Sequence, residues 1–310
     1  MSMPTSTGDS AFYPRGETMI RISLLAAVCL AALPATNAAA QTYKFKTINY
    51  SKSSQTSLHG VNDSGVAVGG FFTATNPYRN CFILQGKKKT AFTNPNGTET
   101  ECWDINSNGD IVGDYADSAG VQHGYLYIAS SQTFTTIDPP GTTETEVYGV
   151  NDSDVVGGYY FDSSGNQNGF IFTGKKYIKV NIKGGTTNQV FGINKAGQFT
   201  ASATLSDGYT HSYLFPKIGT KNGVEIVFSG QIEVAAHHLN NVPQIIATVI
   251  DSSNNYSAGV YDAAASQTYL ISVPNAVLTI GDGINDSQTL VGRFTDSASN
   301  SHGWLATGKL

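Results

Sequence analysis

The stretch that decides the fold is GVNDSGVAVGG, residues 60–70, because close copies of it return along the rest of the chain. The later copies read DINSNGDIVGD from Asp104, GVNDSDVVGGY from Gly149, GINKAGQFTAS from Gly192, HLNNVPQIIAT from His238 and GINDSQTLVGR from Gly283. The asparagines shared by all six copies, called the repeat asparagines below, are Asn62, Asn106, Asn151, Asn194, Asn240 and Asn285. They stand about 45 residues apart, a spacing typical of β-propeller blades.

Each copy lies in a unit of four short runs rich in Val, Ile, Tyr and Phe. In the third unit these runs are TEVYGVN, VVGGYYF, NGFIFTG and KYIKVNI, separated by polar or glycine-bearing turns. The runs have the length of strands and are too short for helices. An asparagine side chain can bond the backbone two residues further on and tolerates a left-handed φ, so the repeat asparagines are expected in tight turns. We therefore predict an all-β domain of six four-stranded antiparallel blades.

The two ends of the domain suggest how the predicted blades close. The segment YKFKTINY, residues 43–50, matches the fourth run of a unit, whereas the last unit stops at HGWLATG, which matches the third run. If the first segment supplies the missing strand, no free sheet edge remains, which is the problem that circular β architectures solve. We expect residues 41–310 to form one six-bladed β-propeller, closed by its N-terminal strand.

The bulk composition agrees with such a domain and excludes one class of partner. Charged residues are only 13% of the chain, while 33 Gly, 16 Tyr and 15 Phe supply turn formers and β-preferring aromatics. The formal net charge is -5, and no stripe of Lys or Arg is present to neutralise phosphates. We therefore expect no binding to nucleic acid.

The N-terminal residues have the pattern of an export signal. From Met19 the chain reads MIRISLLAAVCLAALPATNAAAQ, with basic Arg21, a short apolar run, and Ala38 and Ala40 spaced as in a cleavage site. The apolar run is too short to span a membrane. We expect residues 1–40 to be a signal peptide cleaved after Ala40, with Met19 as an alternative start, and the mature protein to be secreted or periplasmic.

Two cysteines would remain after that cleavage, Cys81 and Cys102. In an oxidising compartment they could pair, and the repeat register places both near the same rim of adjacent blades. The alternative is a pair of buried thiols. Neither CxxC nor a Cys/His spacing typical of zinc sites is present, so we expect no metal ligated by cysteine.

The repeat also resembles a known family. GINDSGxxVG followed by a polar loop and an H-[AG]-[FYW]-[LI] element is similar to the bacterial extracellular HAF-repeat proteins. The matching second elements are HGYLY at His123, NGFIF at Asn168, HSYLF at His211 and HGWLA at His302. The resemblance covers the chain after Gln41 and implies an exported repeat protein. It assigns no chemistry, because that family is described chiefly by its repeats and its export.

Candidate binding residues lie where the second and third units enter their first strands. They are four carboxylates and two rings, namely Glu99, Glu101, Glu144, Glu146, Trp103 and Tyr148. Carboxylates could hold calcium or supply an acid and a base for attack on a glycan, and rings could stack on a sugar. The alternatives are solvated carboxylates on loops and rings that pack between blades.

No nucleophile elbow, phosphate loop or metalloprotease helix is present, so no catalytic residue is assigned. The leading hypothesis is a non-enzymatic, monomeric scaffold without a cofactor, which presents a rim of loops to a carbohydrate or protein partner. One rival is a hydrolase or lyase with an acidic rim pocket, in which calcium could assist. Another is a structural repeat protein of the cell envelope.

Overall fold

Every regular element in residues 43–73 and 79–310, the part of the chain that the computed structural model describes, is a β-strand. The prediction of an all-β domain is thus confirmed. These residues belong to one unit that spans Ala39–Leu310. The expected signal segment, with Met19 and the cleavage after Ala40, lies outside the described residues. Among the described residues no helix is long and apolar enough to cross a membrane.

The strands follow the six repeat units. The first unit holds β2 (Ser53–Thr56), β3 (Gly60–Val61), β4 (Ala67–Thr73), β5 (Asn80–Gln85) and β6 (Lys88–Phe92), and the second holds β7 (Glu99–Ile105), β8 (Ile111–Ala116), β9 (Gln122–Ile128) and β10 (Thr133–Ile137). The third holds β11 (Thr142–Val150), β12 (Val156–Asp162), β13 (Gln167–Phe172) and β14 (Tyr177–Val180), and the fourth holds β15 (Gln189–Ile193), β16 (Phe199–Thr204), β17 (Thr210–Phe215) and β18 (Val224–Glu225). The fifth holds β19 (Gln231–Leu239), β20 (Gln244–Asp251), β21 (Tyr256–Asp262) and β22 (Gln267–Ile271), and the sixth holds β23 (Leu278–Ile284), β24 (Leu290–Thr295) and β25 (Ser301–Thr307).

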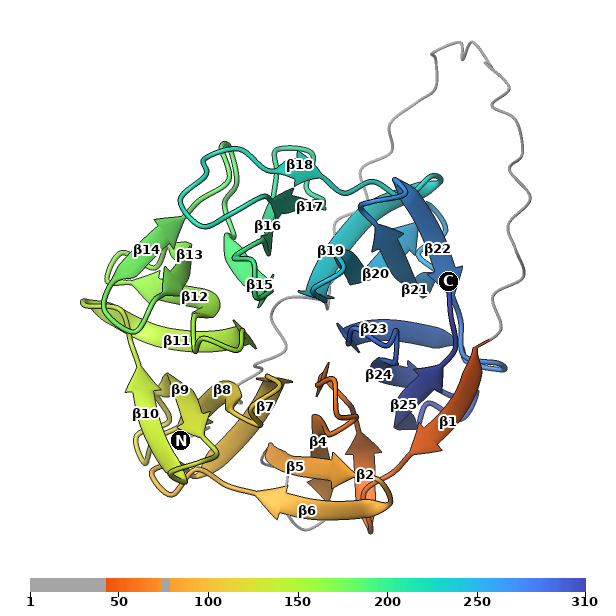
Figure 1. Cartoon of the computed structure of the whole chain (residues 1–310), viewed down its shortest axis with the longest axis horizontal. Coiled ribbons are helices and arrows are strands. Elements are labelled where there is room, and N and C mark those ends of the chain that lie inside the picture. Colours follow the sequence, from red (N-terminus) through yellow and green to blue (C-terminus); the bar gives the residue numbers. More distant parts are fainter. Residues whose placement is uncertain (1–42, 74–78) are drawn as a thin grey trace, which may run out of the picture. The chain divides into compact units, whose positions relative to one another are not determined.

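The hydrogen-bonded strands form five sheets, where the sequence predicted six separate ones. Units two to five are each a four-stranded antiparallel sheet, but the first and last units share a nine-stranded sheet. They merge because β25 also bridges β2 through Gln55 and Ser301. The first strand, β1 (Lys44–Ile48), pairs with β25 so that Thr47 lies opposite Trp304. Figure 1 shows β7, β11, β15, β19 and β23 around one centre, with later strands of each unit further out.

The repeat asparagines form the turns that the sequence predicted. The side-chain oxygen of Asn106, for example, accepts the backbone N–H groups of Asn108 and Asp110, two and four residues on, at 3.0 and 2.9 Å. The amide nitrogen of Asn106 donates to the carbonyl of Asn151 in the next unit at 3.1 Å. Equivalent bonds run from each repeat asparagine to the next, and Asn285 donates to Asn62 at 2.9 Å.

One detail of the turn differs from the expectation. The left-handed residue is not the asparagine but the residue three positions later, which is glycine in three units and Asp154 in the third, at φ 56°. A side chain there is strained, since only glycine adopts this conformation without cost. Burial and the nearby Asp110 carboxylate also raise the pKa of Asp154, so its charge is disfavoured.

We expect Asp154→Gly to raise the free energy of unfolding by about 1 kcal/mol, because it removes both the strain and the repulsion. Urea unfolding at pH 7 measures this change. Gly109→Ala in the second unit, at φ 87°, is the matched reverse control and should destabilise. A loss of stability in Asp154→Gly would mean that the weak 3.4 Å bond from Asn106 to Asp154 outweighs the strain.

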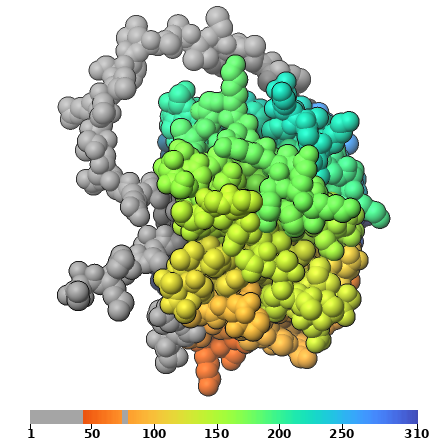
Figure 2. All heavy atoms as spheres, turned by 90° about the vertical axis from the view of Figure 1, so that its left-hand side faces the viewer, coloured from red at the N-terminus to blue at the C-terminus, as the bar shows by residue number. Residues whose placement is uncertain are grey.

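Apolar side chains fill the spaces between consecutive units. Six buried clusters are present among the described residues, and each mixes residues of two neighbouring units. The cluster around Leu58 joins the first unit to the last through Val291. A disulfide between Cys81 and Cys102, with Cα atoms 5.6 Å apart, crosses the cluster between the first two units. Figure 2 shows the second to fourth units packed side by side along the outer face, from yellow to cyan.

Candidate functional site

The first strands of the units bring one residue of each to the centre of the domain. These residues stand three positions before the repeat asparagines and are called the collar: His59, Trp103, Tyr148, Phe191, His237 and Asp282. Successive collar rings touch, with centroids 4.5, 4.8, 5.0 and 5.2 Å apart along the chain. The Nδ1 atom of His237 lies 4.0 Å from a carboxylate oxygen of Asp282. The collar is therefore a nearly continuous band of rings that ends in one acid.

Four of the predicted site residues lie together, two of them in the collar and two next to it. Trp103 and Tyr148 are both half-buried and touch each other, while Glu101 and Glu146, two residues earlier on β7 and β11, are buried. The Glu146 carboxylate accepts hydrogen bonds from the Tyr148 and Tyr159 hydroxyls, each at 2.6 Å. Glu146 is thus not a solvated loop residue, as one reading of the sequence allowed, but the support that orients two tyrosines.

The other carboxylates of the cluster have partners of their own. Glu101 forms an ion pair with Arg79. The indole Nε1 of Trp103 donates to Asp114 on β8 at 2.7 Å. Burial, and then the negative charges of Glu146 and Glu101, hold the pKa of Asp114 well above its usual range. Asp114 is therefore protonated more readily than an ordinary aspartate, and its protonated form can donate a hydrogen bond as well as accept one.

The last two predicted residues are less closely involved. Glu144 is half-buried, and its pKa is raised by burial and by Glu146. Glu99 begins β7, where its backbone pairs with Ala116, and in residues 43–73 and 79–310 no side-chain bond joins it to the cluster. The structure therefore gathers Glu101, Trp103, Glu146 and Tyr148, with Glu144 at the edge of the group and Glu99 apart from it.

Several residues of this cluster were missed in the sequence. Asp114 and Tyr159 come from the second strands, at a repeat position that carries a different residue in every unit, and Arg79 directly precedes β5. Asp114, for instance, aligns with Gly70, Ser202, Thr248 and Arg293. A usable signal existed for His59, which holds the same repeat position as Trp103 and Tyr148.

A second pair of exceptional residues meets across the centre. Two positions before the repeat asparagine, four units have glycine, and a Cβ there would come within 2.8 Å of backbone atoms in the next unit. The second and fifth units instead have Asp104 and His238, and the Nε2 atom of His238 lies 3.1 Å from Asp104 Oδ2. Both side chains also bond the next unit, since Val150 N–H donates to Asp104 and His238 Nδ1 lies 3.0 Å from the Ile284 carbonyl.

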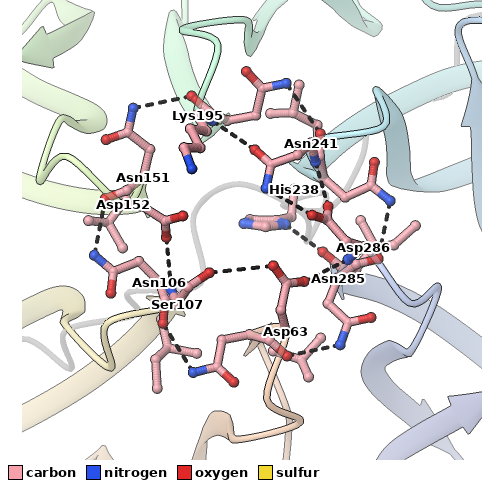
Figure 3. A pocket seen from close by; sticks show the side chains of 18 of the residues that line it. Asp63, Asn106, Ser107, Asn151, Asp152, Lys195, His238, Asn241, Asn285 and Asp286 are labelled. Carbon is pink, nitrogen blue, oxygen red and sulfur yellow. Dashed lines mark hydrogen bonds between the residues drawn. The ribbon is translucent and has the colours of Figure 1, made fainter.

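A polar cavity lies on the other side of this pair, at the ends of the first strands. It is lined by the repeat asparagines and the residues around them, and Figure 3 shows His238 at its centre. Backbone N–H groups link its wall, as from Asp286 to Asp63 at 2.8 Å and from Ser107 to Asp152 at 2.9 Å. Its volume of about 50 Å³ admits a few water molecules, whereas ligand sites usually exceed about 300 Å³.

No metal site emerges from the described part of the chain, where no group of three His, Cys, Asp or Glu side chains is close enough to hold an ion. The expectation of no metal ligands, and the alternative of a calcium site among the four glutamates, both stay predictions. Two of the four glutamates have other partners, since Glu101 pairs with Arg79 and Glu146 accepts from Tyr148 and Tyr159.

Comparisons with known proteins identify the fold. No family model and no curated protein matches the chain. Among solved structures, a mutant of the Aleuria aurantia lectin in complex with Fucalpha1-6GlcNAc is similar over 83% of this chain and 95% of that chain, with 11% identity and a TM-score of 0.51. Another structure of that lectin, described as a six-bladed β-propeller with a novel fucose recognition mode, has 12% identity, covers 81% and 91%, and has a TM-score of 0.50.

A bacterial protein gives a similar result. TolB from Acinetobacter baumannii matches over 74% of this chain and 61% of its own length, with 11% identity and a TM-score of 0.51. At these identities the likeness shows the fold alone, which is a β-propeller.

Proposed function

We propose that this chain is an exported six-bladed β-propeller that binds a carbohydrate through the half-buried rings of Trp103 and Tyr148. The observation that carries the proposal is the support behind these rings, since Asp114 bonds the indole and Glu146 bonds the phenol. Rings on adjacent first strands are thereby held in fixed orientations, which lowers the cost of ordering a site when a ligand binds.

The chemistry of the cluster suits a sugar. The apolar face of a pyranose packs on aromatic rings, and its hydroxyl groups need both donors and acceptors. Here Arg79 donates, Glu101 and Glu146 accept, and Asp114, whose pKa is raised, does both in its protonated form. The similar lectin structures, one in complex with Fucalpha1-6GlcNAc and one described by its fucose recognition, support a carbohydrate as the partner.

The same proposal includes closure of the ring. The antiparallel pairing of β1 with β25 supports a last blade completed by the N-terminal strand. The bond from Asn285 to Asn62 and the apolar cluster shared by Leu58 and Val291 support contact between the first and last blades. Closure would fix the positions of the collar residues, because each first strand then has one place around the common centre.

The test is a glycan array followed by calorimetry with the best oligosaccharide, with and without calcium. We expect Trp103→Ala to weaken binding about 10- to 30-fold, as for an aromatic residue at the centre of an interface. Tyr209→Ala, an exposed ring in the turn after β16, is the control and should bind normally. Unchanged affinity in Trp103→Ala would remove this cluster from the site. A sugar product released by the wild type and lost in Asp114→Asn would favour the hydrolase or lyase.

Export and the HAF-repeat relationship belong to the same proposal. The cleavage expected after Ala40 would give a secreted or periplasmic protein that begins at Gln41, and a propeller closed on itself would remain a monomer. The disulfide between Cys81 and Cys102 supports an oxidising compartment. N-terminal sequencing of the exported protein checks the cleavage, since a first residue other than Gln41 would contradict it.

A further inference from the structure

Arg293 on β24 occupies a defined place beside the first unit. Its neighbour on the same face of the strand, Val291, packs in the cluster of Leu58 and Val61. The Leu58 N–H donates to the Gly292 carbonyl at 3.3 Å. Arg293 therefore lies against the segment that leads into His59, and it is half-buried.

This guanidinium has no carboxylate partner in the described part of the chain. Within residues 43–73 and 79–310 no carboxylate forms an ion pair with Arg293, whereas the other arginine described, Arg79, is paired with Glu101. Asp282 on the neighbouring strand lies by His237 instead, at 4.0 Å. An Arg side chain presents five N–H donors in a planar fork, and that fork matches a carboxylate or a sulfate.

The positive charge of Arg293 acts on two collar histidines, and both rings are uncharged near pH 7. Burial, and then the charges of Arg293 and Arg79, lower the pKa of His59 to about 3. Burial and Arg293 likewise bring the pKa of His237 to about 3. Because both rings are neutral near pH 7, Arg293 is the one charged member of these three basic side chains, and the Asp282 carboxylate lies beside His237. An anionic oxygen would satisfy the arginine and allow a ring to take up a proton.

We infer that Arg293, flanked by His59 and His237, is a subsite for the anionic group of an acidic sugar. The His59 ring stacks on Trp103 with centroids 4.5 Å apart, so this subsite adjoins the rings assigned to sugar binding. The inference rests on the proposed function, and it narrows the ligand to a glycan that carries a uronic acid carboxylate or a sulfate ester. One residue of such a glycan would pack on Trp103 while its acidic neighbour reaches Arg293.

The experiment compares matched oligosaccharides by calorimetry at pH 7. One arm uses oligogalacturonides, a second their fully methyl-esterified forms, and a third sulfated oligosaccharides of equal length. We expect the wild type to prefer one acidic arm over the neutral arm, and Arg293→Gln to weaken acidic binding about 10- to 100-fold while leaving neutral binding unchanged. Lys195→Gln, which removes one positive charge at the opposite end of the first strands, is the control and should retain the preference.

A second readout separates this inference from the proposed function. Sodium glucuronate and sodium sulfate are titrated into wild type and Arg293→Gln, and the ring nitrogens of His59 and His237 are followed by NMR. Anion binding at Arg293 should raise the pKa of at least one ring in the wild type and of neither in the variant. The inference would be overturned if neutral and acidic oligosaccharides bound with equal affinity, or if the preference for the acidic ones survived Arg293→Gln. Either result would leave the proposed sugar binding intact. A raised ring pKa without any glycan binding would support the anion subsite and contradict sugar binding. If neither a raised ring pKa nor glycan binding were observed, both the inference and the proposed function would be wrong.

Discussion

Asp104→Ala is expected to lower the free energy of unfolding by about 3–5 kcal/mol, because it leaves a charged partner without its counter-ion in the interior. Asp104 is 1% exposed and lies 3.1 Å from His238 across the centre of the domain. It also accepts the backbone N–H groups of Ile105 and Val150, at 2.8 and 3.0 Å. The substitution would therefore strand two backbone donors as well as the imidazole.

A double-mutant cycle isolates the energy of the pair itself. Urea unfolding at pH 6 of Asp104→Ala, His238→Ala and the double variant should give a coupling of about 2 kcal/mol or more. His302 and Asp296 provide a matched control, since the same two atom types lie at the same 3.1 Å distance in a more exposed place. Their coupling should stay below about 1 kcal/mol. Additive losses at Asp104 and His238 would show that the two side chains do not act as a pair.

Much of the fold could be predicted because the signal is repeated six times. The spacing of the repeat asparagines defines the units. Each of these asparagines begins a turn, and the same bond from the backbone N–H four residues on to the asparagine side chain recurs at Asn62 and at Asn285. The number of separate sheets could not be predicted, because it depends on one bridge between Gln55 and Ser301. A single pair of this kind leaves no pattern in a sequence.

Only part of the candidate site could be predicted from the sequence, for a related reason. Glu101 and Glu146 share a repeat position, as do Trp103 and Tyr148, so their alignment predicts a common location. Asp104 and His238 are also visible as departures from glycine, but nothing in the sequence indicates that they meet. Their contact joins the second and fifth of the six units, and the two residues lie 134 positions apart in the sequence. Departures from a repeat thus mark candidate residues, and the arrangement of the units in space decides which ones touch.

Stability should fall steeply as the pH drops below 6.5, chiefly because of His59 and His237. Burial, together with the charge of Arg293, lowers the pKa of each ring to about 3, whereas an unfolded histidine has a pKa of about 6.5. Between these values the unfolded chain binds protons that the folded protein excludes, so the stability present above pH 6.5 is lost as the pH falls towards 3. Each ring contributes a slope of up to about 1.4 kcal/mol per pH unit.

The contribution of His238 to stability changes with pH in the opposite direction. Burial disfavours its charged form, but the Asp104 carboxylate and its hydrogen bond raise the pKa of His238 above the usual value. Its contribution is therefore complete below about pH 6.5 and is lost as the pH rises through the raised pKa. A stability maximum near neutral pH follows, with a different histidine responsible for each side.

Substitutions of these histidines distinguish the acid limb of the stability–pH profile from its alkaline limb. Between pH 6.5 and 5, we expect the wild type to lose roughly 2–4 kcal/mol through His59 and His237, a range that allows for the partial exposure of His237. The double variant His59→Gln, His237→Gln should have a much flatter acid limb in urea unfolding, while His302→Gln, at the surface, should follow the wild type. His238→Gln should flatten only the alkaline limb. If the acid limb persisted in the double variant, protons would be entering the folded collar, and the two rings could not be the neutral neighbours that an anion at Arg293 requires.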